Sequence, residues 1–186
     1  MQVYEYYSTD KAMKLYGKRP LRLKWIDTDK GGANIRSRLV CTEVRRPGTD
    51  AVFAPTPPLD AMRALIARAA ERYTSDGRPL TLQLVDISRA HFYAPSVRDV
   101  FVQLPQGDPM HGKPNVCAKL RRTMYGTLDA AEQWARHYTS VLLKVGFVQG
   151  TSSPCHFHHP DRQIWVLVHG DDFFSCAPEQ IPEVVP

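Results

Sequence analysis

Polar and apolar positions change their period several times along the chain, and each change predicts an element. Residues 21–27 and 35–44 alternate between apolar and mostly basic side chains, as the strands of a half-exposed hairpin do. The Gly- and Asn-containing segment 29–34 between them indicates the turn. Residues 100–104 and 115–120 predict a second hairpin, joined by a longer loop that contains Gln-Gly-Asp-Pro.

Two longer segments repeat apolar residues every three or four positions, which is the period of an amphipathic helix. The first covers residues 57–72, with Thr56 as its expected N-cap. The second covers residues 128–145, with Thr127 as its N-cap and Gly146 at its C-terminal end. We therefore expect two helices, each followed by a strand or a hairpin.

Three short apolar runs lead to acidic residues. Residues 80–85 predict a strand that ends at Asp86. Residues 164–168 and 173–176 predict two more strands, and only His-Gly-Asp-Asp separates them. A Gly-Asp pair in this place favours a tight two-residue turn, so these strands predict a hairpin with two adjacent aspartates at its tip.

The two aspartates, Asp171 and Asp172, repel each other when both are ionised. At about 4 Å and an effective dielectric near 20, the repulsion is on the order of 4 kcal/mol before the structure relaxes. A bound cation would remove this penalty, and Asp86 supplies a third carboxylate. One aspartate after a strand plus an Asp-Asp hairpin is the arrangement of two-metal nucleotidyl transfer. The alternative is that each aspartate is an ordinary turn or strand-end residue.

The predicted order of elements is hairpin, helix, strand, hairpin, helix, hairpin, with no internal repeat or low-complexity tract. This order predicts the α+β class, with helices packed on one face of an antiparallel sheet. A length of 186 residues corresponds to one domain or to a fragment of a larger one.

Positive charge is concentrated at the start of the chain. Residues 1–50 hold eleven Lys or Arg and six Asp or Glu, a balance of 11 − 6 = +5, which equals the net charge of the whole chain. Such a basic region favours a polyanion such as a nucleic acid backbone or nucleotide phosphates. The alternative is a solvated basic face without a ligand, and strand alternation lets only some of Lys24, Arg36 and Arg38 share a face.

The composition also suggests where the protein acts. No apolar run approaches the eighteen residues of a membrane span, and residues 1–10 lack the apolar core of a secretory signal. The four cysteines are widely spaced and contain no C-x-x-C pair, as is typical of reduced thiols. We therefore expect an intracellular protein of the cytoplasm or nucleus that is not secreted and has no membrane partner.

Six sequence blocks follow one another along residues 25–177. They are Arg-Ser-Arg-Leu-Val at 36–40, Phe-Ala-Pro at 53–55, Leu-Val-Asp-Ile-Ser-Arg-Ala-His-Phe at 84–92, Leu-Pro-Gln-Gly at 104–107, Lys-Leu-Arg-Arg-Thr-Met-Tyr-Gly at 119–126 with Gln-Trp at 133–134, and Gly-Phe at 146–147 followed by the Asp-Asp hairpin. Together they resemble the reverse transcriptase of Ty1/copia-type retrotransposon polyproteins. The sequence departs from that family at three places, one of which is Ala-Ala at 130–131 where the family has Ala-Pro. His-Gly precedes the two aspartates where the family usually has Tyr-Val, and His91 replaces an aromatic residue that the resemblance places at the nucleotide sugar.

The resemblance implies a single reverse-transcriptase-like domain over residues 1–186, made of fingers and palm, with the thumb absent. Its expected parts are a lead-in at 1–18, which the residue pattern leaves open as a helix fragment or an irregular segment, a basic fingers hairpin at 19–55, fingers and palm with the catalytic acids at 56–177, and a tail at 178–186. The thumb, ribonuclease H and integrase of the full polyprotein are the expected protein partners where they are expressed. Because the sequence ends soon after the acidic hairpin, we expect this chain alone to be a weak polymerase.

The resemblance also implies roles for individual residues. Catalysis and metal binding are expected at Asp86, Asp171 and Asp172, and the resemblance implies that Asp171 is the firmer metal ligand of the hairpin pair. The expected cofactor is Mg²⁺ or Mn²⁺ because carboxylate oxygens are hard ligands. Substrate contacts are expected in two groups: Arg36, Arg38, His91 and Phe92 for the nucleotide, and Gly126, Tyr125, Arg121, Arg122 and His169 for the template and primer. The implied partners are an RNA or DNA template–primer and deoxynucleoside triphosphates.

These features support RNA-directed DNA polymerisation most directly, but they also fit two other functions. One is a non-catalytic nucleic-acid-binding remnant of a retroelement, which keeps the fold and the basic hairpin. The other is an unrelated metal-dependent phosphohydrolase that shares an Asp-Asp turn. Template dependence distinguishes a polymerase from the phosphohydrolase, and metal-dependent nucleotide incorporation distinguishes it from the remnant.

Overall fold

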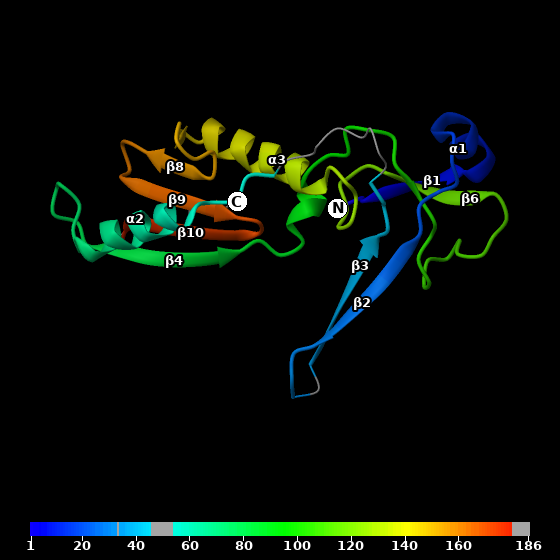
Figure 1. Cartoon of the computed structure of the whole chain (residues 1–186), viewed down its shortest axis with the longest axis horizontal. Coiled ribbons are helices and arrows are strands. Elements are labelled where there is room, and N and C mark those ends of the chain that lie inside the picture. The colour runs from blue at the N-terminus through cyan, green and yellow to red at the C-terminus, as the bar shows by residue number, and fades with distance from the viewer. Residues whose placement is uncertain (33, 46–53, 180–186) are drawn as a thin grey trace. The chain divides into compact units, whose positions relative to one another are not determined.

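A computed structural model describes residues 1–32, 34–45 and 54–179 of the chain. The predicted loop at 47–50 and Phe53 of the Phe-Ala-Pro block lie outside the described residues, as does most of the predicted tail. The chain divides into two compact units, and each unit combines two separate chain segments: Met1–Phe53 with His91–Trp134 in unit 1, and Ala54–Ala90 with Ala135–Pro186 in unit 2. Figure 1 labels most of the elements of both units.

Unit 1 contains a three-stranded antiparallel sheet in the order β1-β6-β5 within the described residues. These strands are β1 (Tyr4–Ser8), β5 (Phe101–Val102) and β6 (Val116–Leu120). Helix α1 (Thr9–Tyr16) follows β1 directly: the Ser8 side chain caps its first turn, and Gly17 ends it with φ +66°. The sequence predicted a helix fragment or an irregular lead-in over 1–18. The helix is present, but the prediction missed β1.

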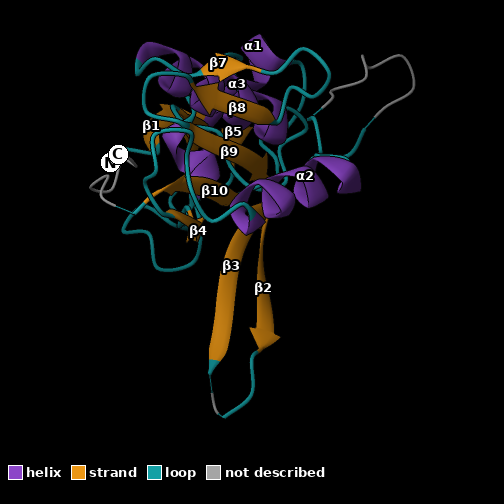
Figure 2. Cartoon of the chain, turned by 90° about the vertical axis from the view of Figure 1, so that its left-hand side faces the viewer, coloured by secondary structure: helices purple, strands orange, loops and turns teal. Residues whose placement is uncertain are grey.

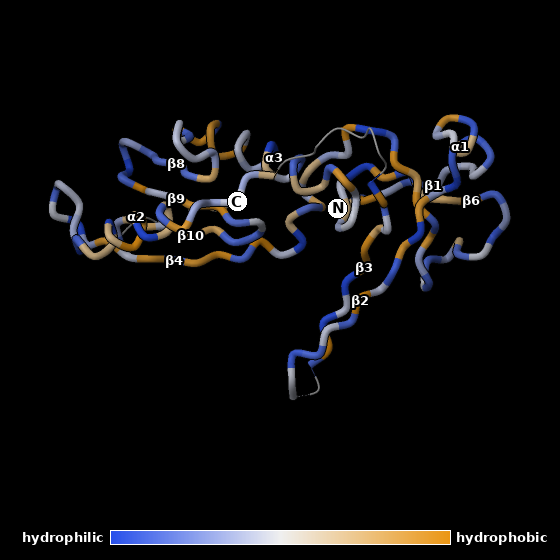
Figure 3. The backbone as a smooth tube through the Cα atoms, viewed as in Figure 1, coloured by the Kyte–Doolittle hydropathy of each residue, from blue (hydrophilic) through white to orange (hydrophobic). Residues whose placement is uncertain are grey.

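The predicted basic hairpin is confirmed in unit 1. Strands β2 (Leu23–Asp29) and β3 (Ile35–Cys41) pair antiparallel, from Leu23 opposite Cys41 to Asp29 opposite Ile35. They form a two-stranded ribbon along which polar and apolar residues mix (Figures 2 and 3). Near Cys41 the hairpin joins a buried cluster of unit 1: Cys41, Val100, Val102, Leu104, Ala118, Leu120 and Met124. The hairpin is therefore anchored by its inner end.

Unit 2 contains a five-stranded antiparallel sheet in the order β4-β10-β9-β8-β7 within the described residues. Its strands are β4 (Leu80–Asp86), β7 (Val148–Gln149), β8 (His156–His159), β9 (Ile164–His169) and β10 (Asp172–Pro178). The predicted strand ending at Asp86 and the predicted hairpin of β9 and β10 are both present. Strand β10 continues to Pro178, so its last residue belongs to the sheet rather than to the predicted tail.

The helices of unit 2 cover both faces of this sheet. Leu65 of α2 (Leu59–Ala70) packs with Leu167 and Cys176, and Phe174 borders the same cluster. Tyr138 of α3 (Ala130–Lys144), in contrast, contacts Phe173, with ring centroids 5.7 Å apart. Because adjacent residues of a strand point to opposite faces, Phe173 and Phe174 place the two helices on opposite sides. The α+β class with antiparallel sheets is confirmed, but the prediction of helices on one face is wrong.

Both predicted helix N-caps are wrong as well. Helix α2 begins at Leu59, and its N-cap position is Pro58, which makes no side-chain capping bond. Helix α3 begins at Ala130, and the Thr127 hydroxyl donates to the Met124 carbonyl at 3.0 Å. Thr56 and Thr127 therefore lie in the approach to each helix. Gly146 does lie just beyond the end of α3, with φ +96°. Among the described residues, no helix is both long and apolar enough to cross a membrane.

Two aromatic rings and a guanidinium group stack on the face of the unit 2 sheet that α2 covers. The His158 and Trp165 rings are stacked at 4.7 Å, and the Arg68 guanidinium lies 4.4 Å from the centre of the Trp165 ring. Burial lowers the pKa of His156. Burial also lowers the pKa of His158, helped by the positive charges of His156, His159 and Arg68. Both His156 and His158 are therefore favoured in their neutral forms.

We expect the free energy of unfolding to fall as the pH is lowered from about 7.5 to about 5.5. Histidine in the unfolded chain has a pKa of about 6.5, so the unfolded state binds protons that the folded state resists. The stabilisation from these two neutral histidines is therefore complete above the unfolded-state pKa of about 6.5 and is lost as the pH falls below it. Urea unfolding at several pH values measures this slope. Replacing His156 and His158 with Gln should flatten it.

Candidate active site

Three chemically active side chains form a row at one end of the unit 2 sheet. Asp86 is the last residue of β4 and lies opposite Asp172, the first residue of β10. Asp172 in turn lies opposite His169, the last residue of β9. Directly opposed residues of an antiparallel pair share a face, and their Cβ atoms are about 4.5–5.5 Å apart. The pairing thus places two carboxylates and an imidazole side by side across three neighbouring strands.

The turn that joins β9 to β10 adds the third carboxylate. Gly170 and Asp171 form the two-residue turn that the sequence predicted, and Gly170 takes the positive φ, +65°, that this turn requires. The Ile87 amide donates to the Asp171 carbonyl at 2.9 Å, which extends the hydrogen-bond ladder beyond Asp86. All three predicted acids therefore meet at one end of the sheet, with Asp172 in register with Asp86 and Asp171 on the turn.

This end of the sheet is accessible on unit 2. Asp86 is exposed, and both hairpin aspartates are half-buried. The face that carries Asp86 continues along β4 with Leu84 and Leu82, which are 62% and 51% exposed. Helix α2 packs further from the turn, against Leu167 and Cys176. A ligand can thus approach Asp86 and Asp172 without displacing α2.

The donor set fits a hard divalent cation that shares its coordination with a substrate. Within the part of the chain that the structure describes, no three His, Cys, Asp or Glu side chains are close enough together to enclose a metal. Mg²⁺, however, is commonly held by one or two carboxylates together with water and substrate phosphates. Asp86 and Asp172 supply such a pair of carboxylates, and Asp171 is the neighbouring residue in the chain.

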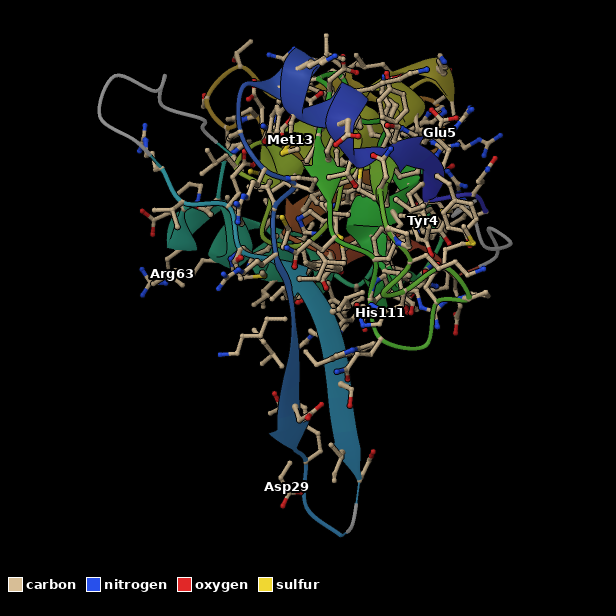
Figure 4. The ribbon with its side chains drawn as sticks, turned by 90° about the vertical axis from the view of Figure 1, so that its right-hand side faces the viewer. Tyr4, Glu5, Met13, Asp29, Arg63 and His111 are labelled. Carbon is tan, nitrogen blue, oxygen red and sulfur yellow. The ribbon has the colours of Figure 1, made fainter. Side chains whose placement is uncertain are left out.

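The predicted nucleotide-binding arginines lie on one face of the β2–β3 hairpin in unit 1. Arg38 is opposite Ile26 and Arg36 is opposite Thr28, so both share a face with Lys24, two residues before Ile26. The sequence suggested that only some of these cations would share a face, but the register aligns all three. None of them forms an ion pair with a residue that the structure describes. The other face carries Asp27 and Asp29, the latter labelled at the far end of the hairpin in Figure 4.

A second group of predicted residues gathers at the inner end of the same hairpin. The rings of His91 and Tyr125 lie 4.2 Å apart, and Phe92 meets Tyr125 edge-on at 6.1 Å. The Cys41 amide at the end of β3 donates to the Tyr125 carbonyl at 2.7 Å. His91, Phe92 and Tyr125 therefore form a small aromatic cluster that is fixed to β3.

Gly126, predicted as a template contact, has a clear structural reason to be glycine. A Cβ atom at this position would lie 2.0 Å from the Cys41 carbonyl oxygen, and its φ is +85°. Only glycine accepts both the close backbone approach and this conformation without strain. Its predicted contact with the template stays a prediction.

Arg121 and Arg122 are engaged within unit 1. Arg121 donates to the Glu5 carboxylate at 2.5 and 3.2 Å, and Arg122 donates to the Tyr93 carbonyl at 2.8 Å. The predicted site residues thus fall into two groups, with the acids and His169 in unit 2 and the remaining eight in unit 1. The roles of Arg121 and Arg122 at the template also stay predictions.

The sequence analysis overlooked a buried ionic cluster in unit 1. The Glu43 side chain is 3% exposed and accepts hydrogen bonds from both terminal nitrogens of Arg98. The Leu128 amide also donates to Glu43 at 3.0 Å, while Arg98 donates to Asp129 at 2.8 Å. Burial acts to raise the pKa of Glu43, but the hydrogen bonds and positive charges outweigh it and hold the pKa below its usual value. The sequence signal for this cluster was a single acidic residue, Glu43, just after the basic strand β3.

The comparison with protein families gives the class to which this chain belongs. The chain belongs to the family described as reverse transcriptase (RNA-dependent DNA polymerase), whose model matches residues 4–181. The resemblance to the reverse transcriptases of Ty1/copia-type polyproteins is confirmed by its relatives.

Three relatives are retrovirus-related Pol polyproteins of plant transposons. The polyprotein of transposon TNT 1-94 from Nicotiana tabacum is 24% identical over 175 residues, which cover 88% of this chain and 13% of that protein. The polyproteins of transposons RE1 and RE2 from Arabidopsis thaliana are 28% and 27% identical to this chain, and the matched residues cover 80% and 85% of it. The chain spans 10–13% of the length of these polyproteins. No solved structure was found to match it.

Proposed function

We propose that this chain is the fingers and palm part of an RNA-directed DNA polymerase of a copia-like retrotransposon. The observation that carries the proposal is the pairing of Asp86 with Asp172, next to Asp171, in a chain of the reverse transcriptase family. The proposed partners are an RNA or DNA template–primer and deoxynucleoside triphosphates. The relatives are named Pol polyproteins, which supports other domains of such a polyprotein as partners, and we propose a thumb, a ribonuclease H and an integrase among them. The proposed site of action is intracellular.

The three aspartates at the end of the unit 2 sheet define the proposed chemistry. Mg²⁺ or Mn²⁺ held by Asp86, Asp171 and Asp172 would supply charge stabilisation at the α-phosphate and a lower pKa for the primer 3′-hydroxyl. Before binding, the mutual repulsion of the acids favours a site that attracts a cation. We propose that His169, directly across from Asp172, contacts the primer or the leaving pyrophosphate.

The residues of unit 1 support the binding of substrate. Arg36, Arg38 and Lys24 present a row of cations without ion-pair partners among the described residues, and guanidinium groups suit phosphate oxygens. The rings of His91 and Phe92, which contact Tyr125, offer apolar surface for the sugar or base of the nucleotide. In this proposal the hairpin binds the triphosphate and the ring cluster binds the nucleoside.

The proposal is tested by primer extension with the 1–186 chain, an RNA template, a DNA primer and either Mg²⁺ or Mn²⁺. We expect slow, template-directed addition of nucleotides, below the usual enzyme rate of about 1 s⁻¹, and complete loss with a chelator. Release of phosphate from nucleotides without a template would instead identify a phosphohydrolase. Binding of template–primer without any incorporation in either metal would identify a non-catalytic remnant.

Replacing Arg36 and Arg38 together with Ala should weaken nucleotide use more than duplex binding. We expect KM for the nucleotide to rise about tenfold, because two charge-assisted contacts are lost, while the affinity for template–primer changes little. Nucleotide titrations in the extension assay and fluorescence anisotropy of a labelled duplex measure the two effects. A double variant of exposed α1 cations, Lys11→Ala with Lys14→Ala, is the matched control. Equal loss of both activities, with a weaker salt dependence of duplex binding, would assign the arginines to the nucleic acid backbone.

A further inference from the structure

Unit 1 carries a pocket that the proposed polymerase chemistry does not use. It has a volume of about 490 Å³ and opens between α1 and the loop that precedes β6. Figure 4 labels Met13 on α1 and His111 on this loop, which both line the pocket. Its apolar lining is formed by Met13, Pro20, Leu104, Val116 and Cys117. The volume falls within the 300–1,000 Å³ that is typical of ligand sites in proteins.

The polar lining of the pocket is positive. Arg19 and Lys113 both line it, and neither forms an ion pair with a residue that the structure describes. No lining residue is acidic. The nearby Asp108 accepts hydrogen bonds from the Tyr4 and Tyr6 hydroxyls and from the Met110 amide, so its charge is engaged elsewhere. The pocket therefore suits a ligand that has an apolar body and negative charge.

The shape of the loop is held by its own hydrogen bonds. The His111 ring donates from Nδ1 to the Leu104 carbonyl at 2.8 Å, and the His111 amide donates to the Asp108 carbonyl at 2.9 Å. These bonds tie the loop to the end of the apolar lining, and Lys113 follows two residues later. The pocket and its cationic edge are thus formed before any ligand binds.

A peptide fits this chemistry better than a nucleic acid strand. No Phe, Tyr or Trp lines the pocket, so an unpaired base would lack the aromatic stacking that usually holds it. Successive helix positions turn by about 100°, which places Lys11 and Lys14 away from the side of α1 that carries Met13 and Thr9. The cations of α1 therefore do not extend the positive edge of the pocket into a track that a phosphate backbone could follow.

We propose that this pocket binds a short acidic segment of a partner protein. One large aliphatic side chain of the segment enters the apolar lining, and carboxylates on either side of it pair with Arg19 and Lys113. The site lies within unit 1, and its function does not depend on the polymerase proposal.

The test uses the 1–186 chain and three labelled peptides of equal length in a fluorescence anisotropy assay. Asp-Glu-Leu-Leu-Asp-Glu carries both features, Asn-Gln-Leu-Leu-Asn-Gln lacks the charge, and Asp-Glu-Ser-Ser-Asp-Glu lacks the apolar side chains. We expect the first peptide to bind and each of the others to bind at least about tenfold more weakly, since each loses one of two contributions near 1.4 kcal/mol.

Variants of the chain locate the binding site. Arg19→Glu with Lys113→Glu should weaken the first peptide about tenfold or more, and Gln103→Trp, at an exposed lining position, should block the pocket without a change of charge. Lys144→Glu with Arg162→Glu makes the same change of net charge in unit 2 and should have no effect. Thermal unfolding of each variant confirms that the fold is kept.

Three results would overturn the proposal. The first is equal binding of all three peptides. The second is an equal loss of affinity for the first peptide in the control with Lys144→Glu and Arg162→Glu, which would show a general charge effect. The third is a single-stranded oligonucleotide that binds in place of the peptide and loses affinity in the Gln103→Trp variant, which would make the pocket a nucleic acid site.

Discussion

Asp86→Asn is expected to reduce metal-dependent primer extension by about a thousandfold and to leave the fold intact. Asp86 is exposed at the end of β4, so its carboxylate contributes little to packing. Its loss removes one of the two carboxylates that face each other across β4 and β10. Metal ions contribute several kcal/mol of transition-state stabilisation, and each 1.36 kcal/mol corresponds to a factor of ten in rate.

The experiment compares single-nucleotide incorporation by the wild-type chain and by four Asp→Asn variants at positions 86, 171, 172 and 161. Asp161 is exposed elsewhere in unit 2 and serves as the matched control. The family resemblance implies that Asp171 is the firmer metal ligand, whereas the register pairs Asp172 with Asp86. The relative losses at 171 and 172 therefore show which aspartate acts in catalysis. Full activity of the Asp86→Asn chain would refute the proposed site.

Elements whose signal is local could be predicted from the sequence. The turn between β9 and β10 is an example, because Gly170 and Asp171 have the right conformational preferences and stand between two apolar runs. Strand β1 was missed because its Tyr-rich sequence does not alternate clearly and its partner, β6, lies far along the chain. Strand pairing over such a distance depends on tertiary packing, which a local pattern does not contain.

The error about the helices has a different cause. Residues 164–168 and Phe173-Phe174 are continuous apolar runs, whereas a strand with one solvated face alternates apolar and polar residues. A continuous run indicates burial on both faces, and the packing of α2 and α3 against opposite faces accounts for it. The signal for the correct architecture was therefore present in the strands rather than in the helices.

The candidate site was predictable in its residues but not in its register. The sequence pointed to Asp86 and the hairpin aspartates, but the choice of Asp172 as the partner of Asp86 depends on how β4 aligns with β10. Similarly, strand alternation suggested that the hairpin cations would be split between two faces, and the pairing of β2 with β3 aligned Arg38 with Lys24 instead. Pairing between segments that are distant in the sequence decides the strand register and which side chains share a face.

Glu43 shows most clearly what the sequence could not reveal. Its partner Arg98 lies 55 positions further along the chain, and Asp129, which also accepts a hydrogen bond from Arg98, lies 129 − 43 = 86 positions further, so no local pattern connects them. In the structure they join the segment after β3 to the residue that precedes α3. The near-complete burial of the Glu43 side chain, at 3% exposure, distinguishes this ion pair from those on the surface.

Glu43→Gln is expected to lower the free energy of unfolding by about 3 kcal/mol, because breaking a buried ion pair costs about 3–5 kcal/mol and Asp129 still holds Arg98. Glu5→Gln is the matched control, since Glu5 and Arg121 are 35% and 54% exposed. A surface pair of this kind contributes about 0–1 kcal/mol. Urea unfolding of both variants measures the difference.

The pH dependence gives a second, independent measure of the same cluster. Because the pKa of Glu43 is held below its usual value, its stabilisation is present above the pKa of an unfolded glutamate, about 4.3, and is lost as the pH falls through the lower, folded value. The gap between wild type and Glu43→Gln should therefore be widest near neutral pH and close in acid. Equal destabilisation by Glu5→Gln and Glu43→Gln, or a gap that stays constant in acid, would show that the buried charge of Glu43 does not stabilise unit 1.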